Sequence, residues 1–215
     1  ADRQEMLAGL THDLRAPLAR LRVRLALLGN NDERAGLTRD ADDMERIVGQ
    51  CLSFLRSEKK PAQPPPPILI ADAISDEVAR HRELGRPLEI YVSDAAASCQ
   101  VMIAHGNLQR LLDNLIDNAL TYAGSAEVSM TRGEGGVQIC VRDHGPGIPE
   151  ADLEQVFQPF VRLDSSRNTD RGSVGLGLAI ARTLIHRHGG ELSLHNHPQG
   201  GFVARLELPL QAASA

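Results

Sequence analysis

The sequence predicts a helical hairpin followed by an α+β two-layer sandwich, and three observations lead to this fold class. Leucines recur in steps of three and four residues from Leu7 to Leu28, the apolar stripe of a helix packed on other helices. Residues 59–67 are rich in proline and predict a semi-rigid linker between two kinds of structure. Beyond the linker, apolar and polar residues alternate from Val137 to Val141, as in a sheet with one buried face.

Residues 1–58 are expected to form the hairpin. Its first helix covers roughly residues 2–29 and ends at the turn signal Gly29-Asn30-Asn31; the second begins near Thr38. The second helix carries a stripe of Leu37, Ala41, Met44, Val48, Cys51 and Leu55, broadened by Ile47 and Phe54. Two such helices leave apolar surface uncovered, so we expect a homodimer through residues 1–58 that forms a four-helix bundle.

Residues 68–210 are expected to form the sandwich, and residues 211–215 a short tail. The patterns predict helices at 71–84, 105–122 and 174–188, and strands at 87–93, 98–104, 126–132, 136–143, 190–196 and 201–209. Strands follow strands in this order, so the helices can cover only one face of the sheet.

Composition excludes several classes of protein. The net charge is −5 and no stretch is strongly basic, which argues against nucleic acid as the main partner. The three cysteines are far apart and form no CxxC pair, which fits a reducing compartment. No apolar run approaches the length of a membrane span.

The first helix carries a candidate nucleophile. His12 lies off the leucine stripe and should face water, Asp13 follows it, and Pro17 should bend the helix at this point. Neutral imidazole is nucleophilic near pH 7, and a carboxylate can orient one ring nitrogen while the other attacks. A solvated surface histidine without a function is the alternative that the helix alone leaves open.

Three places in the second domain carry candidate binding residues. Asn114 and Asn118 lie four apart on one helix face, and their amide oxygens suit Mg²⁺ or the orientation of phosphates. Asp143 follows a strand directly, in a position to accept a hydrogen bond from an exocyclic amine. The glycines of residues 172–178 open a helix and expose amide donors to an anion. Neither the dinucleotide fingerprint nor the P-loop fits this glycine pattern.

Taken together, these motifs resemble the catalytic portion of a sensor histidine kinase of the two-component type. Residues 12–18 (HDLRAPL) resemble the H box, 114–119 (NLIDNA) the N box, 143–147 (DHGPG) the G1 box, 157–160 (FQPF) the F box and 175–178 (GLGL) the G2 box. All five occur in the order and spacing of that family. The sequences of the H box and of the F box region resemble most closely the EnvZ osmosensor type, whose partners are OmpR-like response regulators.

The resemblance implies a fold, cofactors and residue roles. The second domain would be an ATP-binding sandwich of the GHKL (Bergerat) type that uses ATP and Mg²⁺. His12 would accept the phosphoryl group, and Asp13 would polarise the His12 imidazole. Asn118 would ligate Mg²⁺, and Asn114 would lie beside the phosphates. Asp143 would bind the adenine amino group. The remaining implied site residues are Arg162 and Arg167 at the γ-phosphate, and Tyr122, Gly145, Gly147, Phe160, Gly175, Leu176 and Gly177 around the nucleotide.

Where the chain departs from the family pattern, particular functions come into question. Thr121 stands where a basic residue usually reaches phosphate, and Val174 where a small residue is common. Ala16 stands where relatives that dephosphorylate their regulator carry Thr or Asn, so phosphatase activity is expected to be weak. Residues 161–173 have little to bury and are expected to be mobile until nucleotide binds.

Other interpretations remain. His186, His188, His195 and His197 suggest a zinc site if their two segments converge. A nucleotide-binding dimerisation scaffold without phosphotransfer is the functional alternative. The resemblance also implies that the chain is the cytoplasmic portion of a bacterial inner-membrane sensor, anchored upstream of residue 1.

Overall fold

The computed structural model describes residues 21, 23, 25, 32–57, 64–163 and 175–211. The H box, with His12, Asp13 and Ala16, lies outside the described residues, as does Arg167. Most of the expected first helix and of the segment 161–173 is outside them as well. The helical hairpin therefore stays a prediction, whereas the second domain is described almost completely.

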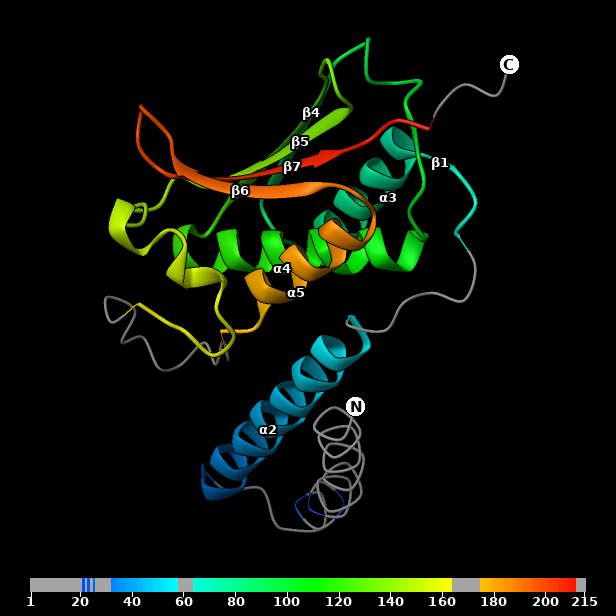
Figure 1. Cartoon of the computed structure of the whole chain (residues 1–215). Coiled ribbons are helices and arrows are strands. Elements are labelled where there is room, and N and C mark those ends of the chain that lie inside the picture. Colours follow the sequence, from blue (N-terminus) through cyan, green and yellow to red (C-terminus); the bar gives the residue numbers. More distant parts are fainter. Residues whose placement is uncertain are drawn as a thin grey trace.

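A mixed five-stranded sheet forms one layer of this domain (Figure 1). Its strands, in spatial order, are β2 (Leu88–Val92), β4 (Ala126–Arg132), β5 (Val137–Arg142), β7 (Phe202–Leu208) and β6 (Glu191–Asn196). The pair β2–β4 is parallel and the other pairs are antiparallel. Inward and outward residues alternate along β4 and β5, as the sequence pattern predicts for a sheet with one buried face.

Three helices pack together on this sheet: α3 (Ile70–Glu83), α4 (His105–Ala123) and α5 (Gly177–Arg187). In Figure 1, α4 and α5 lie below the sheet and α3 stands at the right. Among the described residues they cover one face of the sheet, which confirms the two-layer α+β sandwich. Helix α4 ends at Gly124, which adopts a left-handed conformation and donates its N–H to the carbonyl of Leu120.

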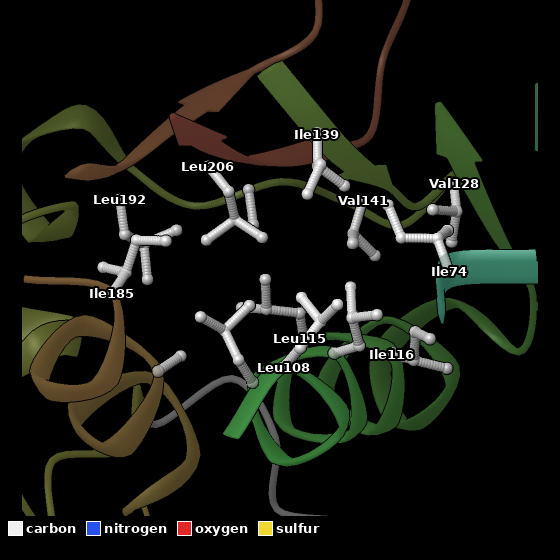
Figure 2. Packing of buried hydrophobic residues seen from close by; sticks show 14 of the residues in the cluster. Ile74, Leu108, Leu115, Ile116, Val128, Ile139, Val141, Ile185, Leu192 and Leu206 are labelled. Atoms are coloured by element: carbon white, nitrogen blue, oxygen red, sulfur yellow. The ribbon is translucent and has the colours of Figure 1, made fainter. Parts of the chain in front are cut away.

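The space between the two layers is filled by branched aliphatic side chains (Figure 2). Residues that meet there from helices and strands are Ile74, Leu108, Leu115, Ile116, Val128, Ile139, Val141, Ile185, Leu192 and Leu206. All are buried, and each is worth roughly 1.5–3 kcal/mol relative to exposure to water. This core fixes α4, which carries Asn114, Asn118 and Tyr122, and β5, which Asp143 follows directly.

Two details differ from the predicted elements. The strand expected at 98–104 is only β3 (Gln100–Val101), and it pairs with β1 (Ile68–Leu69) in a separate two-stranded sheet. The prediction of a full strand there is wrong, because residues 93–99 turn back on themselves through successive backbone hydrogen bonds. The stretch after β5 also contains two short 3₁₀ helices, η1 (Glu150–Asp152) and η2 (Gln155–Phe157).

Helix α2 (Asp32–Ser57) begins six residues before the predicted start at Thr38. The residues that precede Thr38 (DERAGL) are helical as well, so Leu37 lies within the helix. Its last turns contact α5, and Cys51 and Phe54 pack against the core of the sandwich. Among the described residues, no helix is both long enough and apolar enough to cross a membrane.

Candidate functional site

A cavity of about 740 Å³ opens between α4, the loop after β5 and the start of α5. This volume is typical of small-molecule and cofactor sites. The residues expected at the site that line the cavity are Asn114, Asn118, Tyr122, Asp143, Gly147, Arg162, Gly175 and Gly177. Gly145, Phe160 and Leu176 do not line it but lie in the segments that shape it.

The two asparagines lie one turn apart on α4, beside the buried leucines of that helix. Asn114 Nδ2 donates to the backbone carbonyl of Arg110 at 2.6 Å, which fixes the amide and leaves its oxygen as the acceptor. A Cβ added at Gly177 would lie 3.3 Å from Asn114 Oδ1. Glycine at the start of α5 therefore lets that helix approach the amide closely.

Asp143 is a buried carboxylate that its surroundings hold in one orientation. It is 4% exposed, and its Oδ1 accepts hydrogen bonds from the backbone N–H groups of Gly145 at 2.8 Å and Phe202 at 3.1 Å. Burial raises the pKa of this carboxyl group, and the two backbone hydrogen bonds oppose that rise. Within the described part of the chain no hydrogen bond engages Oδ2, so this oxygen is left for a donor in the cavity.

The loop after Asp143 is held by a side chain from β6. Asn196 accepts the Ile148 N–H at 2.9 Å through Oδ1 and donates through Nδ2 to the Ile148 carbonyl at 2.6 Å. Gly147 has φ +75°, and a Cβ there would lie 2.6 Å from Asn196 Oδ1. A Cβ at Gly201 would collide with the carbonyl oxygen of Asp143. The loop therefore needs glycine at 147 and 201 to keep Asp143 in place.

The two chain segments that flank residues 164–174 are joined at their base. Phe160 N–H donates to the carbonyl of Gly175 at 2.9 Å, and both residues have positive φ. A Cβ at Gly175 would lie 2.6 Å from the carbonyl oxygen of Val161. Leu176, next along the chain, is 1% exposed and anchors the start of α5 in the core.

Several cavity residues were not found by sequence reasoning. Gly85, Arg86 and Pro87, which follow α3, line the wall, and so does Gln50 of α2. The Gly-Arg-Pro sequence signals a turn, but only the tertiary fold brings this turn beside α4. Asn196 and Gly201 were missed for the same reason, because they lie some fifty residues after the loop that they support.

The histidines suggested for zinc do not converge in the described part of the structure. His188 Nδ1 hydrogen-bonds the carbonyl of Met102 at 3.0 Å, its Nε2 lies 3.2 Å from Asn107 Nδ2, and burial lowers its pKa. The cluster with metal-ligand character that the described residues form is Glu77, His81 and Asp113. The guanidinium of Arg80 already pairs with both of those carboxylates, which makes the cluster an ion-pair network.

The cavity suits a purine nucleotide with a metal ion. A fixed carboxylate can accept from an exocyclic amine, and glycines without Cβ let a ligand approach the backbone. The amide oxygens of Asn114 and Asn118 are hard ligands of the kind that Mg²⁺ prefers. Arg86 and Arg162 add positive charge to the wall. The residues present therefore fit both groups that the sequence resemblance implies.

Comparisons with known proteins agree with this geometry. Residues 104–212 match the family model described as "Histidine kinase-, DNA gyrase B-, and HSP90-like ATPase". The chain is 36% identical over 214 residues to the sensor histidine kinase GtrS of Pseudomonas aeruginosa, covering 97% of this chain and 42% of GtrS. It is 31% identical to the sensor protein RstB of Escherichia coli, covering 98% and 49% of the two chains. The chain thus spans about half the length of these curated relatives.

Solved structures share the fold. Full-length ShkA in complex with AMPPNP superposes with a TM-score of 0.77 at 24% identity, covering 98% of this chain and 47% of that one. The ATP-binding domain of PrrB from Mycobacterium tuberculosis gives a TM-score of 0.56 at 26% identity, covering 70% of this chain and all of that one (100%). The similarity to ShkA thus extends along almost the whole chain, whereas the similarity to PrrB covers 70% of it.

Proposed function

Because the chain belongs to the histidine kinase-, DNA gyrase B- and HSP90-like ATPase family, we propose that it binds ATP with Mg²⁺ and transfers the γ-phosphoryl group to His12. In a second step the phosphoryl group passes from His12 to an aspartate of a response regulator. The chain is thus the kinase part of a two-component signalling protein. Its similarity to sensor histidine kinases extends over nearly all of its length, which supports this assignment.

The buried carboxylate in the wall of the cavity is the observation that carries the proposal. Asp143 is fixed by two backbone donors and leaves one oxygen for the adenine amino group. A fixed acceptor of this kind distinguishes adenine, which offers an amine, from guanine, which offers a carbonyl at the same place. Tyr122 and Gly147 line the cavity with Asp143, whereas Gly145, Phe160 and Leu176 support its wall.

We assign the phosphate end of the nucleotide to the asparagines and to the start of α5. Asn118 would hold Mg²⁺ and Asn114 would lie beside the phosphates, while the N–H groups of the first turn of α5 would favour an anion. Mg²⁺, when bound, neutralises charge on the phosphoryl oxygens. Arg162, an exposed residue of the cavity wall, and Arg167 donate to the γ-phosphate. Because this reaction requires positioning more than covalent help, these donors and the orientation of His12 by Asp13 carry most of the catalysis.

The other partners belong to the same proposal. The regulator is OmpR-like, given the resemblance of the H box to the EnvZ type. The chain acts as a homodimer through residues 1–58, and it is the cytoplasmic part of a sensor anchored in the inner membrane. The curated relatives are about twice as long as the region that they share with this chain, which leaves them room for sensing and anchoring segments.

Incubation with γ-labelled ATP and Mg²⁺ tests the kinase. The chain should acquire a label that is labile in acid and stable in base, as phosphohistidine is, and His12→Gln should remove it. His105→Gln is the matched control, because His105 is an exposed histidine outside the cavity and its loss should leave the label unchanged. ATP binding without any label would instead favour the scaffold, and a label retained in His12→Gln would exclude His12 as the acceptor.

Ala16 leads to a narrower proposal about the reverse reaction. An Ala methyl group cannot orient the water that attacks a phospho-aspartate, whereas a Thr hydroxyl can. We propose that the chain dephosphorylates its regulator poorly and that Ala16→Thr accelerates this step by on the order of tenfold or more. The rate at which purified phospho-regulator decays measures the dephosphorylation step. Autophosphorylation of the chain is the control and should be the same in the parent and the variant. Equal decay rates with the parent and the variant would contradict the role of Ala16.

A further inference from the structure

The turn after α3 brings a guanidinium group into the wall of the nucleotide cavity. Arg86 lines the cavity, and in the described part of the wall its only cationic companion is Arg162. Arg86 Nη1 donates to Asp117 Oδ1 at 2.6 Å. Asp117 lies on α4 in the same turn as Asn114 and Asn118. The guanidinium is therefore placed beside the turn of α4 that carries the two amides.

A buried histidine holds Arg86 in this position. Arg86 Nη1 lies 3.0 Å from His81 Nδ1, and the backbone N–H of Arg86 donates to the His81 carbonyl at 3.2 Å. A guanidinium has donors only, so Nδ1 accepts from Arg86. Nε2 lies 3.2 Å from Arg80 Nη2 but also faces two carboxylate oxygens, and the ring hydrogen is assigned to Nε2 on account of these acceptors. His81 is 0% exposed, and this N–H points to Asp113 Oδ1 at 2.9 Å, with Glu77 Oε1 at 3.2 Å.

The far side of His81 is a closed ion-pair network. Arg80 pairs with both Glu77 and Asp113, so these carboxylates and the imidazole satisfy one another without a metal ion. Glu77 is also buried. The network joins α3 to α4, and its contact with His81 restrains Arg86, which lines the cavity together with its partner Asp117.

We propose that Arg86 is a phosphate-binding residue for the nucleotide and that His81 is its positioning residue. The proposal rests on the nucleotide-binding function proposed above. The described side-chain bonds of Arg86 both use Nη1, so the N–H groups on Nη2 and Nε are available to phosphoryl oxygens. A guanidinium suits this task because its planar donors match two phosphate oxygens at once. Asp117 keeps the side chain extended along α4 and limits the rotamer freedom that binding would otherwise remove.

Comparison of ATP, ADP and adenosine separates a phosphate contact from a structural role. Affinities of the full chain for the three ligands, with Mg²⁺ present, are measured by calorimetry for the parent, Arg86→Gln and Arg132→Gln. Arg132 is the matched control, an exposed arginine on β4 outside the cavity. We expect Arg86→Gln to weaken ATP and ADP by about tenfold or more while adenosine changes less than about twofold. Arg132→Gln should resemble the parent for all three ligands.

Two variants of His81 test whether this residue positions Arg86. His81→Gln keeps one acceptor and one donor, whereas His81→Leu removes both. The ratio of ATP affinity to adenosine affinity should stay near the parent value in His81→Gln and fall in His81→Leu, as it does in Arg86→Gln. A misfolded variant would lose adenosine binding too, so the ratio reports positioning and not stability.

The outcomes are distinct. If the parent binds none of the three ligands, the nucleotide-binding function itself is wrong. If the parent binds ATP and Arg86→Gln binds it equally well, or loses ATP and adenosine to the same extent, Arg86 makes no phosphate contact. If His81→Leu keeps the parent ratio, His81 does not position Arg86.

Discussion

Asp143 shows how a single residue can be set for recognition at the expense of stability. Its burial removes water from a carboxylate, and in the described part of the chain two backbone N–H groups replace that water at Oδ1. Because the pKa of Asp143 is raised in the fold, this carboxyl group favours the folded state only at low pH. That contribution is complete below the unfolded pKa and is lost as pH rises through the folded pKa.

Asp143→Asn should therefore separate binding from stability. The Asn oxygen can still accept from Gly145 and Phe202, but its NH₂ group meets the adenine amine as donor against donor. We expect ATP affinity to fall by about tenfold to a hundredfold, and the free energy of unfolding at pH 7.5 to be at least that of the parent. Calorimetry and urea unfolding measure the two quantities. An unchanged affinity, or a clear loss of stability, would contradict this account of Asp143.

Affinity for adenosine should depend on pH through the same carboxyl group. Adenosine carries no titrating phosphate, and its amine hydrogen-bonds best to the ionised carboxylate. Because the pKa of Asp143 is raised, we expect adenosine affinity to fall with decreasing pH in a window above about pH 4, the ordinary value for Asp. The same titration with Asp143→Asn should lack this component. Parallel pH profiles for parent and variant would assign the effect to another group.

At the same scale, the residues that sequence could identify are those whose motifs are local. Asp143 follows a strand and Asn114 and Asn118 share a helix face, so short-range patterns locate them. Arg86 and Asn196 carry no such pattern, since each reaches the site from a distant part of the chain. Their contribution depends on the packing of α3 against α4 and of β6 beside the loop after β5, which no local periodicity encodes.

At the scale of elements, hydrophobic periodicity located the main helices and strands of the sandwich to within a few residues, whereas it placed the start of α2 six residues too late. It failed at β1 and β3, because a two-residue strand has no period to detect. It also missed η1 and η2, which are single turns between the strand and the glycine-rich segment. A helix or strand could thus be predicted where it is long enough for its buried face to produce a periodic pattern of apolar residues.

Two glycines at the starts of helices should respond to alanine with opposite signs. At Gly175 a Cβ would lie 2.6 Å from the Val161 carbonyl oxygen on a backbone with φ +75°, so Gly175→Ala should lower the free energy of unfolding by about 1–3 kcal/mol. ATP binding should weaken as well, because the Phe160–Gly175 hydrogen bond shapes the cavity wall. Urea unfolding and calorimetry measure both effects.

Gly106 is the matched control for this substitution. It lies in the first turn of α4, and a Cβ there meets nothing within 4 Å. Gly106→Ala should raise the free energy of unfolding by about 0.5–1 kcal/mol, since alanine loses less backbone entropy in a helix. Equal stability of Gly175→Ala and the parent would show that the backbone around Phe160 and Gly175 can shift to accommodate a Cβ without loss of stability.

At the scale of the whole molecule, α2 divides its apolar residues between two tasks. Near its end, Cys51 and Phe54 pack against the core of the sandwich, and Gln50 reaches the cavity wall. Earlier in the helix, Leu37, Met44 and Ile47 stay 41%, 48% and 39% exposed. Three large apolar side chains exposed on one helix are typical of a surface that another chain covers. This supports the homodimer proposed for residues 1–58.

Charge placed on this surface should dissociate the dimer. Met44→Glu combined with Ile47→Glu would bury two carboxylates at the interface, a penalty of several kcal/mol if they stay ionised. We expect the parent to sediment as a dimer at tens of micromolar and the double variant as a monomer that still binds ATP. Leu84→Glu is the control, because Leu84 is 61% exposed but lies at the end of α3 and not on α2, and this variant should remain a dimer. A monomeric parent with α2 folded, or a dimeric double variant, would show that the exposed face of α2 serves some other contact.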